Sequence, residues 1–330
     1  MTRRRRGRGR QVDGIVLLNK PAGLSSNGAL RRVQRLLDAN KAGHTGSLDP
    51  AATGMLPLCF GEATKTSAWL LDADKTYRVM ARLGVATDTG DAEGNALKEM
   101  PVPHLSASDW KAQLAAFVGP GEQVPPMYSA LKKDGQRLYE LARKGQTVAR
   151  AARPITISSI ELLECAGRRL VFRVRCSKGT YIRVLVEDIA RRAGTVAYTR
   201  RLHRESVAGF EGCGMTSLGG LERAVAALGS ERPDWLLPVD RALEHLPRVS
   251  LGSGCGRLFC EGQAVASGEP GTAESSQGEA VRVYASDGRF LGVGERSGLA
   301  GIAPKRVFSQ ASSEPGGRAD ERRQSTCAKP

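Results

Sequence analysis

One short segment concentrates small residues and proline around a single acid. It reads GHTGSLDPAATGMLP, residues 43–57, and the acid is Asp49. A phosphate-binding loop is excluded, because GxxxxGK[ST] is absent and the GEATKTS that follows lacks the required glycine spacing. Two interpretations remain: a structural turn in which Asp49 bonds its own backbone, or a turn that presents the carboxylate to a substrate. The flanking glycines favour the second, since functional side chains are often held on such turns.

The neighbouring residues predict the elements that hold this segment in place. DGIVLLNKP is typical of a short apolar strand that ends at Pro21. SSNGALRRVQRLLDAN has a Ser/Asn cap and then apolar residues at helical spacing, which predicts a basic amphipathic helix. After the segment we expect a strand through 56–60 and a helix through 62–72. KTYRVMARLG alternates apolar and polar residues with the period of a half-buried strand.

Further along the chain, helices and strands follow one another without a regular rhythm. SDWKAQLAAFVG predicts a core-facing helix, whereas ITISSIELLE and RLVFRVRC predict strands. TYIRVLVEDIARRAG predicts a helix that starts near Thr180 and stops at Gly194. Because no βαβ repeat emerges, we expect an α+β fold with a largely antiparallel mixed sheet flanked by helices.

The composition also changes along the chain. Residues 125–153 are polar, basic and bounded by prolines, which indicates a protruding insertion. From about residue 250 the sequence has glycine-rich short strands, and AVRVYASDGRFLGVG predicts a hairpin that turns at Asp287-Gly288. The two ends have almost nothing to bury. We therefore expect disordered tails at 1–10 and 310–330, a main domain at 11–248 and a small β-rich domain at 249–309.

The net charge of +15 extends beyond the tails. Residues 1–10 carry +6 and residues 311–330 carry +1, which leaves +8 on residues 11–310. A fold this basic indicates a polyanionic partner such as RNA or DNA, although solubility explains the RRRRGRGR tail equally well. The seven cysteines contain no CxxC pair, so we expect neither disulfides nor a zinc site. With no apolar run long enough for a membrane span and no apolar stretch behind the N-terminal arginines, the sequence predicts a cytoplasmic protein.

GHTGSLDPAATGMLPLCFGEATK resembles the catalytic segment of the TruB family of tRNA pseudouridine synthases. The likeness continues, in family order, through DGIVLLNKPAGLSSN, DKTYRVMARLGVATDTGDAEG and CSKGTYIRVLVEDIA. It is dense over residues 12–210 and looser over 250–308. The resemblance implies a pseudouridine synthase fold in which 125–153 is an RNA-clasping thumb and the C-terminal module is a PUA-like RNA-binding domain.

The resemblance further implies an isomerase that needs no cofactor and no metal. Members of the family flip one T-loop uridine of tRNA, at position 55, detach its uracil at N1 and rejoin it through C5. The four histidines (44, 104, 203, 245) form no ligand cluster, in agreement with this. The essential aspartate of the family falls on Asp49. An ionised carboxylate can attack C1′, stabilise it or remove a neighbouring proton, and the sequence does not distinguish these roles.

The same resemblance assigns roles to other side chains. Arg183 is expected to pair with Asp49 and to keep its pKa low. Tyr77 is expected to stack on the detached uracil and handle the C5 proton, and Tyr181 to wall the pocket. His44 corresponds to the residue that fills the gap left by the flipped base.

Three further positions complete the expected site. Lys20 and Pro21 match an NKP feature of the family, which we interpret as backbone support for the catalytic loop. One position departs from the family pattern. AYTRRL places Thr199 where the family has a leucine beside the flipped base, so we expect a looser or wetter wall there.

The expected partner is the T-arm of tRNA, bound by a monomer that needs no protein partner and no membrane. Two alternatives belong to other classes. A non-catalytic tRNA-binding or tRNA-folding protein is disfavoured by the intact Asp49, Arg183 and Tyr77. A glycoside hydrolase would need a second carboxylic acid as proton donor, and none is evident in the matched segments.

Overall fold

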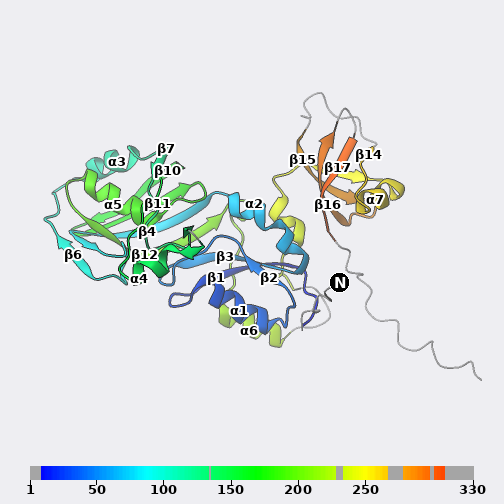
Figure 1. The fold of residues 1–330 in the computed structure, drawn as a ribbon, viewed down its shortest axis with the longest axis horizontal. Helices are drawn as coiled ribbons and strands as arrows, with labels where there is room; N and C mark the ends of the chain where they lie inside the picture. The colour runs from blue at the N-terminus through cyan, green and yellow to red at the C-terminus, as the bar shows by residue number, and fades with distance from the viewer. Residues whose placement is uncertain (1–8, 134, 228–232, 267–277, 298–300, 309–330) are drawn as a thin grey trace, which may run out of the picture. The chain divides into compact units, whose positions relative to one another are not determined.

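The computed structural model describes residues 9–133, 135–227, 233–266, 278–297 and 301–308, and the chain divides into two compact units, 1–245 and 246–330 (Figure 1). Residues 1–8 and 310–330 of the predicted tails lie outside the described residues. Arg10, assigned to the first tail, is instead tied to the fold. Its N–H donates to the Asp38 carbonyl at 2.5 Å, and its carbonyl accepts from the N–H of Asn40 at 3.0 Å.

An eight-stranded sheet organises the first unit. Its order is β1-β3-β12-β4-β11-β10-β7, and β2 pairs with β3. The strands are β1 (Gly14–Lys20), β2 (Ala42–His44), β3 (Thr53–Phe60), β4 (Lys75–Leu83), β7 (Gly119–Gln123), β10 (Arg153–Ala166), β11 (Arg169–Cys176) and β12 (Ala197–Val207). Among these described strands only the β12–β3 pair is parallel. This confirms the predicted α+β fold with a largely antiparallel sheet.

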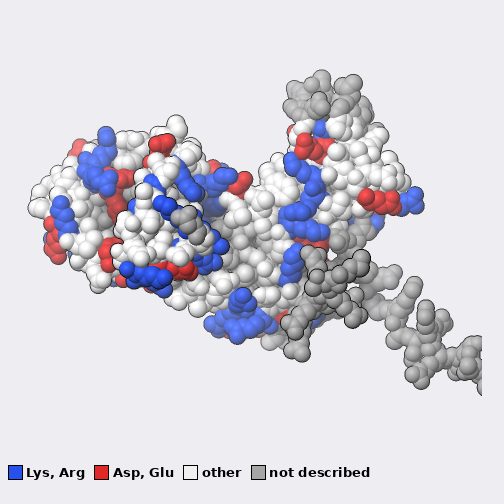
Figure 2. Space-filling view, viewed as in Figure 1, with Lys and Arg blue, Asp and Glu red and all other residues white. Residues whose placement is uncertain are grey.

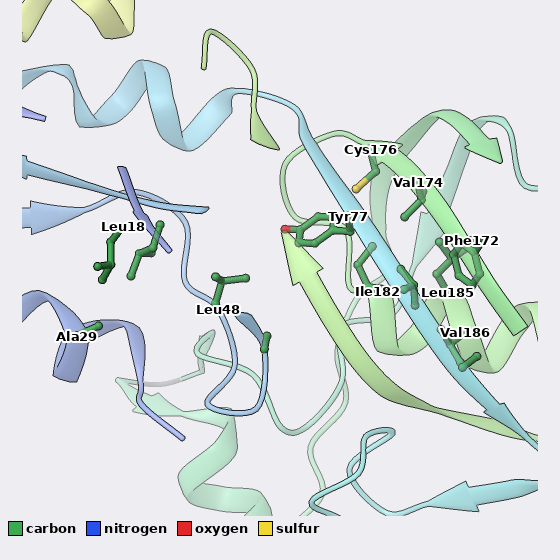
Figure 3. Close-up of a cluster of buried hydrophobic side chains, with 14 of the residues drawn as sticks. Leu18, Ala29, Leu48, Tyr77, Phe172, Val174, Cys176, Ile182, Leu185 and Val186 are labelled. Carbon is green, nitrogen blue, oxygen red and sulfur yellow. The ribbon is translucent and has the colours of Figure 1, made fainter. Parts of the chain in front are cut away.

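Helices cover one face of this sheet and one of its edges. α3 (Ala107–Ala115) contacts β10, and α5 (Ile182–Arg192) contacts β4 and β12, whereas α1 (Ser26–Leu36) and α6 (Leu218–Ala226) lie beside β2 and β1. Figure 3 shows the resulting core, with Phe172 and Val174 of β11 close to Ile182, Leu185 and Val186 of α5. A pair of short strands, β5 (Val85–Thr87) and β6 (Ala96–Glu99), and a 3-10 helix η2 (Val239–Leu243) complete the unit.

Two predicted helices begin or divide differently in the structure. The helix expected over 62–72 is a 3-10 helix η1 (Gly61–Thr66) followed by α2 (Ser67–Asp72). The helix expected from Thr180 begins at Ile182, because Tyr181 is its extended N-cap with φ −93° and ψ 106°. Tyr181 therefore caps the helix instead of forming its first turn, and its carbonyl accepts from the N–H of Leu185 at 3.1 Å.

Strand β4 has the alternation that the sequence predicted. Tyr77, Val79 and Ala81 are buried toward the helices, and Arg78 and Arg82 are exposed on the outer face. Successive side chains of a strand point to opposite faces, so one strand serves two surfaces. The outer face of the sheet is therefore rich in arginine.

The insertion at 125–153 has more structure than a polar loop. It contains the strands β8 (Lys132–Lys133) and β9 (Gln136–Arg137) and the helix α4 (Leu138–Arg143). Leu138 and Leu141 of this helix are buried. These two leucines give the basic segment a small apolar base of its own.

The second unit is a five-stranded sheet with one helix. Its order is β13-β15-β16-β17-β14, with strands β13 (Arg248–Leu251), β14 (Val265–Ala266), β15 (Ala280–Ala285), β16 (Phe290–Ser297) and β17 (Gly301–Val307), and the helix is α7 (Ser253–Cys260). β15 and β16 form the predicted hairpin, and Gly288 in its turn has φ +83°. None of the described helices has the length and apolar character needed to cross a membrane.

Gly54 of β3 is expected to be intolerant of any side chain. Its φ is +102°, and a Cβ there would lie 2.2 Å from the Arg204 carbonyl oxygen. Gly54→Ala should lower the free energy of unfolding by about 2–4 kcal/mol, because it adds a backbone clash to left-handed strain. Urea denaturation measures this loss.

Gly209→Ala is the matched control. Gly209 has φ +88°, but nothing lies within 4 Å of the position that an alanine methyl would occupy, so only strain of about 1 kcal/mol is expected. Equal losses in the two variants would show that the contact with Arg204 is not what excludes a side chain at Gly54.

Candidate active site

A pocket of about 300 Å³ opens where β4 and β12 meet three irregular segments of the first unit. The segments are the loop at 46–49, residues 129–130 of the insertion, and the turn at 177–181 that leads into Ile182 and Arg183 of α5. This volume is typical of a site for a small molecule or a single base. Within the described part of the chain, no group of three or more His, Cys, Asp or Glu side chains is arranged to hold a metal ion.

The loop that carries Asp49 is fixed by its backbone. The Ser26 hydroxyl accepts from the Leu48 N–H at 2.7 Å and donates to the Leu48 carbonyl at 3.0 Å. Lys20 is completely buried, and its ammonium donates to the carbonyls of Pro50 at 3.1 Å, Leu24 at 2.7 Å and Pro21 at 2.9 Å. These bonds hold the backbone on both sides of Asp49, at Leu48 and at Pro50. They are the kind of contact expected of residues that support the loop.

Arg183 lies directly against Asp49. Its Nε is 3.0 Å from Asp49 Oδ2, and its Nη2 donates to Asp49 Oδ1 at 3.3 Å. The other guanidinium donors reach the carbonyls of Thr89 at 3.0 Å and Tyr128 at 2.7 Å. The Arg183 side chain is 7% exposed and that of Asp49 is 42% exposed. The cation is thus locked in the protein, while the carboxylate stays open to the pocket.

The electrostatics of Asp49 differ from the sequence-based expectation. Burial in the pocket raises the pKa of Asp49 above its ordinary value of 3.8, and Arg183 opposes this rise without reversing it. The expectation of a low pKa was wrong because desolvation of the carboxylate outweighs the guanidinium charge. Arg183 still favours the ionised form of Asp49, since it adds a permanent positive charge at contact distance.

A second acid near Arg183 was missed by the sequence analysis. Asp91 Oδ2 is 3.8 Å from Arg183 Nη1, and Asp91 Oδ1 accepts from the Thr89 hydroxyl at 2.6 Å and the Glu93 N–H at 3.0 Å. The Asp91 charge contributes to raising the pKa of Asp49. The segment ATDTGDAEG, already matched to the family, was the only signal for this residue.

The two tyrosines expected in the site both line the pocket. Tyr77 is buried on β4, and Figure 3 shows its ring extending toward the side where Leu48 lies. Burial raises the pKa of Tyr77 above 10, so the phenol keeps its proton at neutral pH. Tyr181 is fixed through its backbone, because Gln123 accepts from its N–H at 2.9 Å and donates to its carbonyl at 3.4 Å.

Thr199 does not wall the pocket. Its side chain is buried, and its N–H donates to the Gly90 carbonyl at 2.9 Å, so it braces the segment that carries Asp91. The register of β12 on β4 shifts between Thr199 and Arg201, and Leu202 lines the pocket instead. Thr199 lies opposite Ala81 and Leu202 opposite Val79, so both face the buried side of the sheet, and Leu202 is the one nearer to Tyr77 along β4.

His44 lies on β2, outside the residues that line the pocket. Its Nδ1 is buried and has no hydrogen-bond partner among the described residues. Burial and the nearby Arg204 charge lower the pKa of His44 below 6.5, so the ring is neutral at pH 7. A flat, neutral ring is what a stacking role requires.

Arg204 is the functional candidate that sequence reasoning overlooked. It is fully buried on β12, and it donates from Nε to the Met55 carbonyl at 2.6 Å and from Nη2 to the Gly46 carbonyl at 2.9 Å. Its charge also opposes the rise in the pKa of Tyr77. One side chain therefore links the start of the Asp49 loop, the strand after it and Tyr77. An arginine on an ordinary strand has no sequence signal for burial.

Arg204→Met should raise the pKa of His44 relative to the wild type, because it removes a positive charge that disfavours the imidazolium. Arg204→Lys keeps the charge and should leave the pKa of His44 nearly unchanged. NMR titration of the histidine ring protons measures both variants, with His104 as an internal reference. An unchanged His44 titration in the methionine variant would mean that Arg204 does not act on this ring.

Comparison with known proteins assigns the chain to a family. A family model described as TruB family pseudouridylate synthase (N terminal domain) matches residues 34–182, and one described as Pseudouridine synthase II TruB, C-terminal, matches residues 247–308. A protein of Chromohalobacter salexigens named tRNA pseudouridine synthase B is 49% identical over 308 residues, covering 93% of this chain and 98% of its own. One of Pseudomonas putida strain GB-1 with the same name is 50% identical, covering 91% and 96%.

Solved structures share the fold. A chain from a crystal structure of a Cbf5-Nop10-Gar1 complex aligns with a TM-score of 0.70 at 25% identity, covering 94% of this chain and 91% of that one. A chain from an H/ACA RNP bound to a substrate RNA containing 2′-deoxyuridine aligns with the same TM-score at 22% identity, covering 96% and 93%. On sequence identity over nine-tenths of its length and on fold, the chain belongs to the TruB family of pseudouridylate synthases.

Proposed function

We propose that this protein is a tRNA pseudouridine synthase that isomerises uridine 55 of the T-loop, with Asp49 as its essential carboxylate. The observation that carries the proposal is the Asp49–Arg183 pair, with Nε to Oδ2 at 3.0 Å, at the edge of a pocket of about 300 Å³. The names of the close relatives support the substrate and the reaction.

The chemistry follows from where the carboxylate lies. Breaking the bond between N1 and C1′ leaves an electron-poor sugar carbon, which an ionised carboxylate attacks, stabilises or relieves of a neighbouring proton. Arg183 sets the orientation of Asp49, and its own burial keeps it from turning toward solvent. Tyr77 offers a ring on which the detached uracil stacks while it turns to present C5.

Access to the uridine requires that the base leave its stack, at a cost of a few kcal/mol. The phosphates around it then need cations, and Figure 2 shows Lys and Arg side chains in several patches over the surface. The insertion at 125–153, whose residues 129–130 line the pocket, carries such cations. Its guanidinium groups at Arg137 and Arg143 lie 5.9 and 5.6 Å from the Tyr139 ring centroid, an arrangement of charge and aromatic surface suited to RNA.

The proposal extends to the second domain and to the oligomeric state. The 249–309 domain is proposed as a second RNA contact, and the enzyme as a monomer that needs no protein partner. Binding should be salt-sensitive, because phosphate contacts release counterions.

The alternatives are less well supported. A non-catalytic RNA-binding protein has no need of a locked guanidinium beside an open carboxylate. A glycoside hydrolase needs a second carboxylic acid as proton donor. Asp91 is an acid whose charge acts on Asp49, but it accepts bonds from Thr89 and Glu93 and does not line the pocket.

Asp49→Asn should abolish pseudouridine formation while leaving the fold intact. The amide keeps the shape of the carboxylate but lacks its charge, so we expect a rate loss of at least ~10³-fold. Carbodiimide labelling and primer extension on an unmodified tRNA transcript detect the product, with a stop at the T-loop uridine for the wild type alone. A stop of equal strength with the asparagine variant would refute the assignment.

The stability of the same variant provides an independent check on folding. The folded-state pKa of Asp49 is raised, so its ionisation costs stability above that pKa and costs nothing below the unfolded value. Asp49→Asn should therefore keep the wild-type melting temperature or exceed it at pH 7. A large drop would mean that the loss of activity reflects unfolding.

Arg183→Gln should move the acid limb of the pH–rate profile to higher pH. Activity requires ionised Asp49 and falls as the pH drops through its pKa, which is already above 3.8. Removing the adjacent cation raises that pKa further, because Arg183 favours the ionised form. The control is Arg192→Gln, which changes an exposed arginine of the same helix. Identical acid limbs for Arg183→Gln and the wild type would contradict electrostatic coupling of the pair.

A further inference from the structure

A second pocket, of about 400 Å³, lies on the outer face of the first unit's sheet. Its lining contains four arginines and a tyrosine, together with Met80 and Ala81. The arginines are Arg82 of β4, Arg168 and Arg169 at the start of β11, and Arg200 of β12, and the tyrosine is Tyr198. All four arginines are exposed. No residue of this pocket takes part in the lining of the Asp49 pocket.

The strand register forces these cations together. Arg82 lies directly opposite Arg169 of β11 on one side and Tyr198 of β12 on the other. Arg200 falls where the register shifts, between Thr199 and Arg201, and has no partner on β4. Like charges directly opposite each other destabilise a sheet. The arrangement therefore favours any anion that binds between them.

Among the described residues, an acidic side chain pairs with only one of the four arginines. Arg169 pairs with Glu164, but no described residue forms an ion pair or hydrogen bond with the side chains of Arg82, Arg168 or Arg200. Further along β11, an arginine on the same face of the sheet is paired with acidic side chains. There Arg173 pairs with Glu161 and Glu205 at 2.7 Å each.

The second pocket also lies away from the reaction site. Tyr77 and Arg82 are both on β4, but they point to opposite faces of the sheet. Five residues of strand separate them along β4, roughly 17 Å at the usual rise. An RNA segment bound at Arg82 is thus not the nucleotide that enters the Asp49 pocket.

We propose that this outer pocket binds the phosphodiester backbone of RNA, through a part of the tRNA other than the arm whose uridine reacts. Guanidinium groups suit phosphate because they offer paired donors in one plane. Four of them line this pocket, three of them without an acidic partner among the described residues. Tyr198 adds an aromatic surface on which a base stacks. The identity of the RNA as tRNA rests on the proposed function; the phosphate site itself rests on the arginine cluster.

The test compares a full-length tRNA transcript with the isolated T-arm hairpin of the same tRNA. Arg82→Glu/Arg200→Glu should weaken binding of the full transcript at least tenfold at about 0.1 M salt, and should lower the slope of log K against log salt by about 2. Binding of the hairpin should change by less than about twofold, because the hairpin occupies only the Asp49 side of the sheet. The rate of pseudouridine formation at saturating tRNA should stay close to the wild-type rate.

Lys111→Glu/Arg192→Glu is the matched control. It reverses the same number of charges at exposed positions of α3 and α5, on the helical face of the sheet. The proposal is overturned if this control weakens the full transcript equally, or if the outer-face variant weakens hairpin and transcript in parallel, since either result means a general charge effect. Melting temperatures verify that both variants are folded, and Arg82→Gln/Arg200→Gln, without charge reversal, should show a smaller loss in the same direction.

The same data separate the two proposals. If the wild type converts neither RNA, the proposed function fails, but the difference in transcript binding still decides the phosphate site. If the wild type converts the hairpin and the outer-face variant binds the full transcript as tightly as the wild type, only the phosphate site fails.

Discussion

The structure depends on one buried guanidinium. Arg183 is taken out of water with its donors distributed over Asp49, the Thr89 and Tyr128 carbonyls and the neighbourhood of Asp91. A buried charge is tolerated only when its hydrogen-bonding groups are occupied. Three separate segments of the chain must therefore arrive together around this side chain. The same arrangement leaves the Asp49 carboxylate exposed on one side only, toward the pocket.

Other buried cations near the pocket also donate to backbone carbonyls. Lys20 ties Pro50 of the Asp49 loop to Pro21 and Leu24, and Arg204 holds Gly46 and Met55. Lys75 donates to the carbonyls of Leu70, Leu71 and Ala73 at 3.3, 2.8 and 2.5 Å. Burial lowers the pKa of both lysines to about 8. Irregular backbone near a pocket has carbonyls that no strand or helix satisfies, and buried cations supply the missing donors. Rigidity of the loops thus comes from side chains rather than from secondary structure.

The central sheet separates two kinds of surface. Its helical face packs the core and ends at the Asp49 pocket, whereas its outer face has arginines whose pairing with acids varies along the strands. Alternate residues of the same strands form the two surfaces, so a change of register on one face changes the other as well. The shift at Thr199 illustrates this, because it brings Leu202 to the pocket and leaves Arg200 unpaired on the outer face.

By itself, the sequence determined the elements with strong periodicity and the loop with unusual chemistry. The alternation of β4, the hairpin at Asp287-Gly288 and the α+β class follow from local patterns, because burial and turn geometry act over a few residues. Asp49 was recognisable from its glycine and proline neighbours, and its pairing with Arg183 was expected only through the family resemblance. The tertiary structure alone decided the roles of Asp91 and Arg204, the place of Leu202 instead of Thr199, and the direction of the pKa shift of Asp49. These depend on desolvation and on contacts between residues as far apart as Asp49 and Arg183, 134 positions along the chain, and no local pattern in a sequence encodes them.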